Sequence, residues 1–69
     1  MIRPLTMEAA DYLGEVVRKS DGKRFEVAMG TEEHAYLYAP DERTPPVTWD
    51  ELLADYTMAD GSPCGVEET

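Results

Sequence analysis

The chain has 69 residues and a formal net charge of −9, because fifteen Asp and Glu face six Lys and Arg. Small soluble domains commonly carry a net charge of magnitude about 2–8, and proteins that bind nucleic acid or anionic membranes need a basic patch. Direct binding to DNA, RNA or a membrane is therefore not expected. The length suits one domain with a small core, which the 42% of hydrophobic residues can fill.

One cysteine, Cys64, and one histidine, His34, limit the chemistry available to the chain. A single cysteine cannot form an intrachain disulfide. One cysteine and one histidine also supply too few ligands for a zinc site. No spacing singles out a pair of carboxylates for general acid–base catalysis. The sequence therefore predicts a protein that is not an enzyme and has no metal or other cofactor. No apolar run is long enough for a signal peptide or a membrane span, which predicts a cytoplasmic protein.

A short helix is the first predicted element, over Thr6–Leu13, with Thr6 as its N-cap and Gly14 as the residue that ends it. A helix of roughly two turns is marginal alone and must pack on the rest of the domain. On a helical wheel, three acids fall within about 60° of one another, opposite the apolar residues. These acids are Glu8, Asp11 and Glu15, and the apolar residues are Ala9, Ala10 and Leu13.

Three antiparallel strands are predicted next, over Glu15–Lys19, Arg24–Met29 and His34–Ala39. Asp21-Gly22 between the first two is a strong hairpin signal, because Gly supplies the positive φ that the turn requires. The second strand alternates apolar and polar residues, which predicts one buried face. The residues expected on that face are Phe25, Val27 and Met29.

Four basic residues surround the hairpin turn: Arg18, Lys19, Lys23 and Arg24. Such a cluster can contact a phosphate. Charged residues are also common at exposed hairpin ends, and pairing with Glu15 and Glu26 across the strands is the favoured interpretation.

The last predicted helix follows a proline-rich loop, Pro40–Pro46, and starts at Thr48. Thr48-x-x-Glu51 is a capping box, in which each side chain accepts from the other residue's backbone N–H. An apolar stripe at i, i+3, i+4 and i+7 is expected to complete the core. Its members are Trp49, Leu52, Leu53 and Tyr56.

These elements predict a single α+β domain over residues 1–69, in the order α-β-β-β-α. It comprises a short N-terminal helix, a three-stranded antiparallel sheet and a C-terminal helix. Residues 57–69 are expected to be a loosely ordered tail of turn and coil. The alternative is a small SH3-like β-barrel, in which the last helix is a single turn and residues near Val47 and Val66 add short strands.

The acidic residues are unevenly distributed along the chain. Residues 39–69 contain eight acids and one base, whereas residues 1–38 contain seven acids and five bases. Like charges on one helix face destabilise it by tenths of a kcal/mol per pair, so the density suggests a use beyond solvation. The residues predicted to bind a partner are Asp41, Glu42, Asp50, Glu51, Asp55 and Asp60, followed by Glu8, Asp11 and Glu15.

The segment TWDELLADY, Thr48–Tyr56, with its flanking carboxylates, resembles the small acidic anti-CRISPR inhibitors that bacteriophages encode as DNA mimics. The resemblance implies a monomer in the cytoplasm of a bacterial host that blocks the DNA-binding or PAM-recognition groove of a defence complex. A type I CRISPR surveillance complex is the expected target, and the partner is a basic, nucleic-acid-binding effector subunit. The competing hypothesis is a small phage structural or adaptor module that binds a protein through Tyr36, Tyr38 and Trp49.

Overall fold

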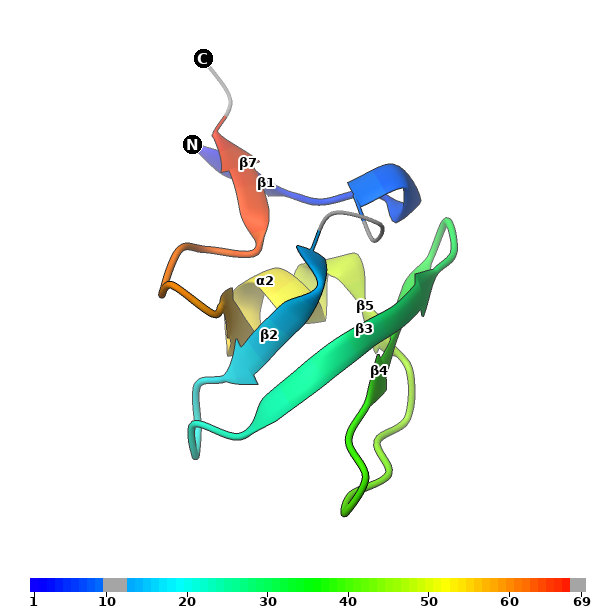
Figure 1. Cartoon of the computed structure of the whole chain (residues 1–69). Coiled ribbons are helices and arrows are strands. Elements are labelled where there is room, and N and C mark those ends of the chain that lie inside the picture. The colour runs from blue at the N-terminus through cyan, green and yellow to red at the C-terminus, as the bar shows by residue number, and fades with distance from the viewer. Residues whose placement is uncertain (10–12, 68–69) are drawn as a thin grey trace.

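In the described part of the chain, short antiparallel strands make up most of the fold, and the α-helix Trp49–Asp55 packs against them (Figure 1). The computed structural model describes residues 1–9 and 13–67. Five strands form one curled sheet, and two form a separate small sheet close to both chain ends. In chain order the elements are β1 (Ile2–Pro4), the 3-10 helix η1 (Met7–Ala9), β2 (Glu15–Arg18), β3 (Arg24–Gly30), β4 (His34–Tyr38), β5 (Val47–Thr48), α2 (Trp49–Asp55), β6 (Tyr56–Met58) and β7 (Gly65–Glu67).

The β2–β3 hairpin turns where the sequence predicts it. Gly22 has φ 73°, a conformation that residues with a Cβ rarely adopt. Its backbone N–H donates to the carbonyl oxygen of Arg18 at 2.8 Å. The turn thereby fixes the register of the two strands, in which Val16 lies opposite Phe25 and both side chains are buried.

The predicted α+β fold with a helix near each end is wrong. The strand order of the main sheet is β5-β4-β3-β2-β6, so the segment after α2 returns to pair with β2. Within the predicted helix Thr6–Leu13, Met7–Ala9 form the 3-10 helix η1, and residues 10–12 lie outside the described part of the chain. Strands at Val47 and Val66 are features of the SH3-like alternative, although α2 has seven residues, about two turns.

A β-bulge interrupts the predicted alternation of β3. Val27 lies opposite Leu37, but the next partner of β4, Tyr36, lies opposite Met29, so the register shifts by one residue. A one-residue shift moves the following side chains to the other face of the sheet. Met29 is therefore 54% exposed, whereas Phe25 is buried. The prediction that Met29 is buried is wrong.

The capping box at the start of α2 is present as predicted. The Thr48 side-chain oxygen accepts from the backbone N–H of Glu51 at 3.1 Å, and the Glu51 carboxylate accepts from the backbone N–H of Thr48 at 3.2 Å. Two of the backbone donors at the helix start are thereby satisfied. The negative charge of Glu51 also lies near the positive end of the helix dipole, which is favourable.

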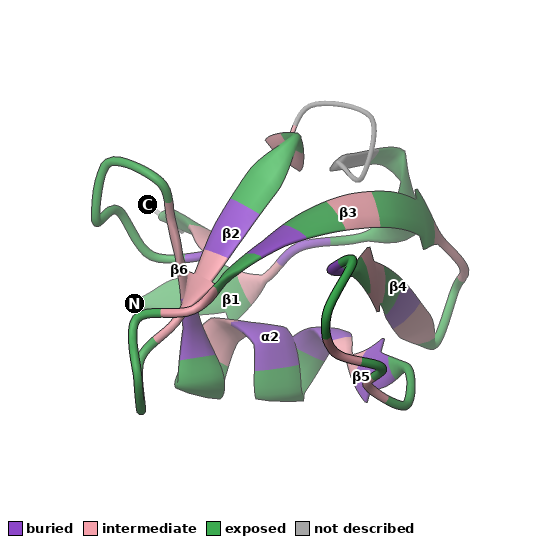
Figure 2. Cartoon of the chain, turned by 60° about the horizontal axis from the view of Figure 1, so that its bottom comes forward, coloured by how far each residue is buried: buried purple, intermediate pink, exposed green. Residues whose placement is uncertain are grey.

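The predicted apolar stripe of α2 does complete the core. Trp49, Leu52 and Tyr56 are buried and Leu53 is half-buried. Figure 2 shows the buried side of α2 turned towards the sheet and its exposed side turned away. The indole N–H of Trp49 donates to the carbonyl oxygen of Thr31 at 2.8 Å, so its polar atom is satisfied as well.

The last residues are not turn and coil throughout, because they include β6 and β7. β6 pairs with β2, and β7 pairs with β1 in the register Arg3 opposite Val66. Cys64, between these strands, is fully buried, and burial raises the pKa of its thiol to about 11. At neutral pH it therefore stays a thiol and serves as a small apolar core residue.

Candidate protein-binding surface

Eight of the nine acids predicted to bind a partner lie among the described residues, and Asp11 lies outside them. They are distributed over five parts of the fold. Glu8 is on η1, Glu15 on β2, Asp41 and Glu42 in the β4–β5 loop, Asp50, Glu51 and Asp55 on α2, and Asp60 in the β6–β7 loop. The contacts of each group decide whether its charge remains available to a partner.

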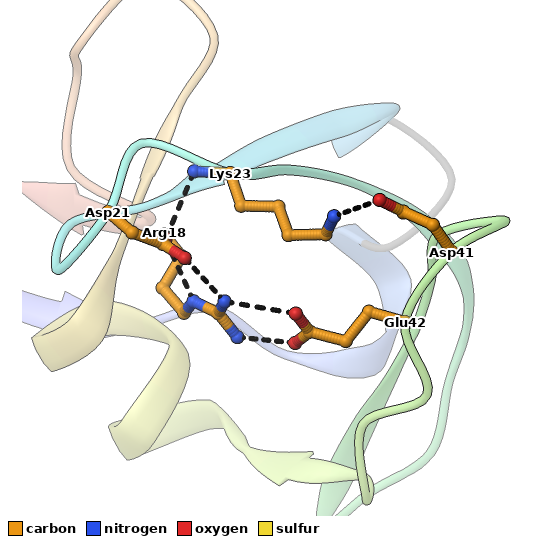
Figure 3. Close-up of polar contacts among 5 residues, drawn as sticks. All are labelled: Arg18, Asp21, Lys23, Asp41 and Glu42. Carbon is orange, nitrogen blue, oxygen red and sulfur yellow. Dashed lines mark hydrogen bonds and ion pairs between the residues drawn. The ribbon is translucent and has the colours of Figure 1, made fainter.

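Asp41 and Glu42 are ion-paired with the β2–β3 hairpin (Figure 3). The Arg18 guanidinium donates to Glu42 at 2.6 Å and 3.2 Å and to Asp21 at 2.6 Å and 3.0 Å, and the Lys23 ammonium donates to Asp41 at 2.7 Å. We call these five residues the hairpin–loop ion cluster. It joins positions 24 residues apart in sequence and carries two bases against three acids, so most of the charge of its carboxylates is neutralised.

The charged state of this cluster is stabilised by its own contacts. Hydrogen bonds from Arg18 lower the pKa of Asp21 to about 2 and lower the pKa of Glu42, and the hydrogen bond from Lys23 lowers that of Asp41. The same contacts raise the pKa of Arg18. The Arg18 guanidinium also lies 5.1 Å from the ring centroid of Phe25, a cation–π contact that links the cluster to the core.

A pH dependence follows for the Glu42→Gln variant. A carboxylate whose folded pKa is lowered contributes stability above its unfolded pKa, about 4.3 for Glu, and loses it as the pH falls through the folded value. The wild-type protein should therefore have a higher Tm than Glu42→Gln at pH 7, and the difference should shrink as the pH falls below about 4. Circular dichroism melts at five pH values measure it. A difference that persists at pH 2 would show that Glu42 acts through packing.

The remaining bases of the hairpin are also used within the fold. Arg24 pairs with Glu15 across the β2–β3 ladder at 3.0 Å, as predicted from the sequence. The Lys19 ammonium donates to the carbonyl oxygen of Ala54 at 3.0 Å, and its backbone N–H donates to that of Asp55 at 2.9 Å. Lys19 therefore caps the C-terminal end of α2, where a positive charge is favourable. The second part of that prediction, pairing with Glu26, is not seen among the described residues.

Asp50, Glu51 and Asp55, here called the α2 acids, are all exposed, and none forms an ion pair with another described residue. Glu51 and Asp55 also line a groove of about 580 Å³ beside α2. Pro45, Val47 and Tyr56 contribute apolar surface to this groove. Arg18 and Lys19 line the same groove, so its carboxylates lie beside cations of this chain and the groove itself is not an unoccupied cation site.

Asp60 and Glu8 lie outside the groove. The Asp60 carboxylate accepts from the backbone N–H of Ser62 at 2.9 Å, and this bond lowers its pKa, so it stays charged in a tight turn. Glu8, on η1, is exposed and lines a different hollow together with Glu32. The structure therefore does not gather the predicted acids beside one groove, and the α2 acids are the subset that lies together and remains unpaired.

One of the three residues named in the adaptor hypothesis, Trp49, is not accessible to a partner. Trp49 is only 6% exposed and its indole N–H is bonded within the fold, so it offers no surface to a partner. Tyr36 and Tyr38 are 40% and 56% exposed on β4. Met29 lies opposite Tyr36, and Glu26 lies opposite Tyr38. These neighbours could not be predicted from the sequence, because they depend on the bulge in β3 and on the strand register.

None of three comparisons with known proteins finds a match: no family model, no curated protein and no solved structure matches the chain. Within residues 1–9 and 13–67, no helix is long and apolar enough to cross a membrane, and no group of three His, Cys, Asp or Glu side chains is placed to hold a metal ion.

Proposed function

We propose that the protein is a non-enzymatic inhibitor that binds a basic, nucleic-acid-binding protein through the α2 acids. Its site of action is the cytoplasm of a bacterial host, and its target is the DNA-binding or PAM-recognition groove of a defence complex. A type I CRISPR surveillance complex is the first candidate, with one of its effector subunits as the direct partner. The acidic face of the helix takes the place of DNA phosphates in that groove.

The proposal rests on the difference between the acids that form ion pairs within the fold and the acids that do not. Arg18, Lys23 and Arg24 pair with four acids, which accounts for one negative charge of the nine. The rest of the net charge lies outside these pairs, and the α2 acids form its densest exposed group on a regular element. Lys and Arg side chains that normally hold phosphates also bind carboxylates well.

The rigidity of α2 supports the same use. The capping box fixes its start, Lys19 caps its end, and Leu52 anchors it with a side chain that is fully buried. Carboxylates on a preorganised helix lose little conformational freedom on binding, so more of the electrostatic energy appears as affinity. Association is expected to be fast and to slow steeply with added salt.

The first experiment identifies the partner. Tagged protein is incubated with lysate of a bacterium that carries a type I CRISPR system and is eluted over a salt gradient, with and without competing duplex DNA. A nucleic-acid-binding complex that is released by both salt and DNA supports the proposal. Recovery only of proteins without a basic groove contradicts it.

The Asp50→Asn/Glu51→Gln/Asp55→Asn variant tests the surface itself. Gln at the third helical position keeps the capping box, so the fold is retained while three charges are lost. Affinity for the captured complex should fall by about tenfold or more, because the variant loses three charge contacts worth up to about 1 kcal/mol each. Surface plasmon resonance at two salt concentrations, together with a Tm, measures the effect.

A matched control removes the same charge elsewhere. Glu32, Glu33 and Glu67 are exposed and form no ion pair with another described residue. Their replacement by Gln should change the affinity by less than about threefold, since only long-range attraction is reduced. Equal losses in both variants would show that net charge acts without a defined site, and the role of α2 would be abandoned.

A further inference from the structure

The outer face of β3 and β4 exposes three large side chains that the core does not use. Met29 lies opposite Tyr36 in the β3–β4 register, and Tyr38 follows Tyr36 by two residues, so all three lie on one side of the sheet. They are 54%, 40% and 56% exposed. We call Met29, Tyr36 and Tyr38 the tyrosine face. Without the bulge in β3, Met29 would point to the core side, so the bulge is what completes this face.

Carboxylates border the tyrosine face on one side. Tyr38 lies opposite Glu26, and Glu26 lies opposite Glu15 on β2, so the three side chains form one row across three strands. Opposed side chains of this kind have Cβ atoms about 4.5–5.5 Å apart. Glu15, Glu26, Tyr38 and Pro40 line a shared hollow of about 540 Å³, and Arg24 lines it on the side of Glu15.

The charges in this row are unbalanced. Two like charges directly opposite each other destabilise a sheet, and one cation relieves the pair, since Arg24 bonds Glu15 at 3.0 Å. Glu26 forms no ion pair with any described residue. The hollow thus presents an aromatic ring beside an unneutralised carboxylate, and both attract a cation.

We propose that the tyrosine face binds an extended segment of a partner protein that carries arginine or lysine. A guanidinium or ammonium group stacks on Tyr38 within reach of the Glu26 carboxylate, and Tyr36 and Met29 contact the apolar stem of the segment. This site is built from strands and does not include the α2 acids, so it can be tested separately from the proposed function.

Other occupants fit the charges less well. A nucleic acid would stack on the tyrosines but would bring phosphates towards Glu15 and Glu26, and single-strand binding needs a basic groove. An apolar partner would bury the Glu26 carboxylate without a counter-charge, which is costly. A second copy of the chain would bring another −9 of charge to the same surface.

The test is an NMR titration of the ¹⁵N-labelled full chain with a six-residue peptide of alternating Arg and Gly, capped at both ends. The matched probe has Gln in place of each Arg. Amide shifts are expected at Glu26, Met29, Tyr36 and Tyr38 with the Arg peptide, and much smaller shifts with the Gln peptide. The Tyr36→Ala/Tyr38→Ala variant should bind at least about fivefold more weakly, whereas Tyr38→Phe, which keeps the ring, should stay within about twofold.

Three other outcomes of the titration would each contradict the proposed site on the tyrosine face. Shifts confined to α2, or equal binding by the wild type and the Tyr36→Ala/Tyr38→Ala variant, would place the cation elsewhere. Shifts at the tyrosine face that depend on protein concentration and not on peptide would indicate self-association. Loss of peptide binding in the variant lacking the α2 acids, with the tyrosine variant unaffected, would remove this site and leave the proposed function intact.

Discussion

The Leu52→Ala variant is expected to lose about 2–5 kcal/mol of unfolding free energy, since removal of a fully buried Leu costs that much in transfer and cavity terms. Leu52 has 0% exposure at the centre of α2. A domain of this size has a total stability of about 3–10 kcal/mol, so the loss removes a large fraction of it and should lower Tm by roughly 8–40 °C. Urea unfolding followed by fluorescence of Trp49, the single Trp of the chain, measures the loss.

Met29→Ala is the matched comparison for this prediction. The sequence pattern assigns both residues to the core, but the structure leaves Met29 54% exposed. Its truncation should cost less than about 0.5 kcal/mol, as for other surface substitutions. If Met29→Ala destabilised the protein as much as Leu52→Ala, the bulge and the exposed tyrosine face would both be wrong.

A second large loss of stability is expected for Gly65→Ala, although this substitution adds only one methyl group. A Cβ at this position would lie 2.7 Å from the carbonyl oxygen of Arg3 and 2.8 Å from Cδ1 of Leu53. The nearest atom is Cγ2 of the Ile2 side chain at 2.5 Å, and the Arg3 oxygen is backbone of the paired strand β1, so relief requires β1 and β7 to separate or α2 to shift. Overpacking of this kind costs about 1–3 kcal/mol, which lowers Tm by roughly 5–20 °C in a small domain.

Val66→Ala, the next residue of β7, provides the control. Val66 is 40% exposed, so its truncation should lower Tm by only a few degrees, consistent with about 0.5 kcal/mol or less. Hydrogen exchange adds a local measurement, since the amides of the β1–β7 ladder should lose protection in Gly65→Ala before those of β3. Unchanged protection and Tm in Gly65→Ala would show that the close approach of β7 to β1 does not occur.

The position of the proposed acidic surface could be predicted from the sequence only in part. The α2 acids were found because a capped amphipathic helix has a fixed period, so its polar face is known once its apolar stripe is known. Asp41 and Glu42 were chosen from local composition, but their partners Arg18 and Lys23 come from a hairpin far away in the sequence. Charge counts along the chain do not show which acids such contacts neutralise.

Local features of this fold can be predicted from the amino-acid sequence alone. The Asp21-Gly22 turn, the capping box of α2 and its apolar stripe each depend on residues within a few positions of one another, and all three are present. Their energetics are those of a single turn or helix, where side-chain type and spacing decide the conformation.

The other features of the fold depend on contacts between distant parts of the chain. β1, β5, β6 and β7 are two or three residues long, too short to carry a recognisable period, and they become strands because partner strands supply their hydrogen bonds. The bulge in β3, the burial of Cys64 and the exposure of the tyrosine face follow from the same non-local pairing. In a domain this small, the choice of pairing decides both which residues form the core and which charges remain free for a partner.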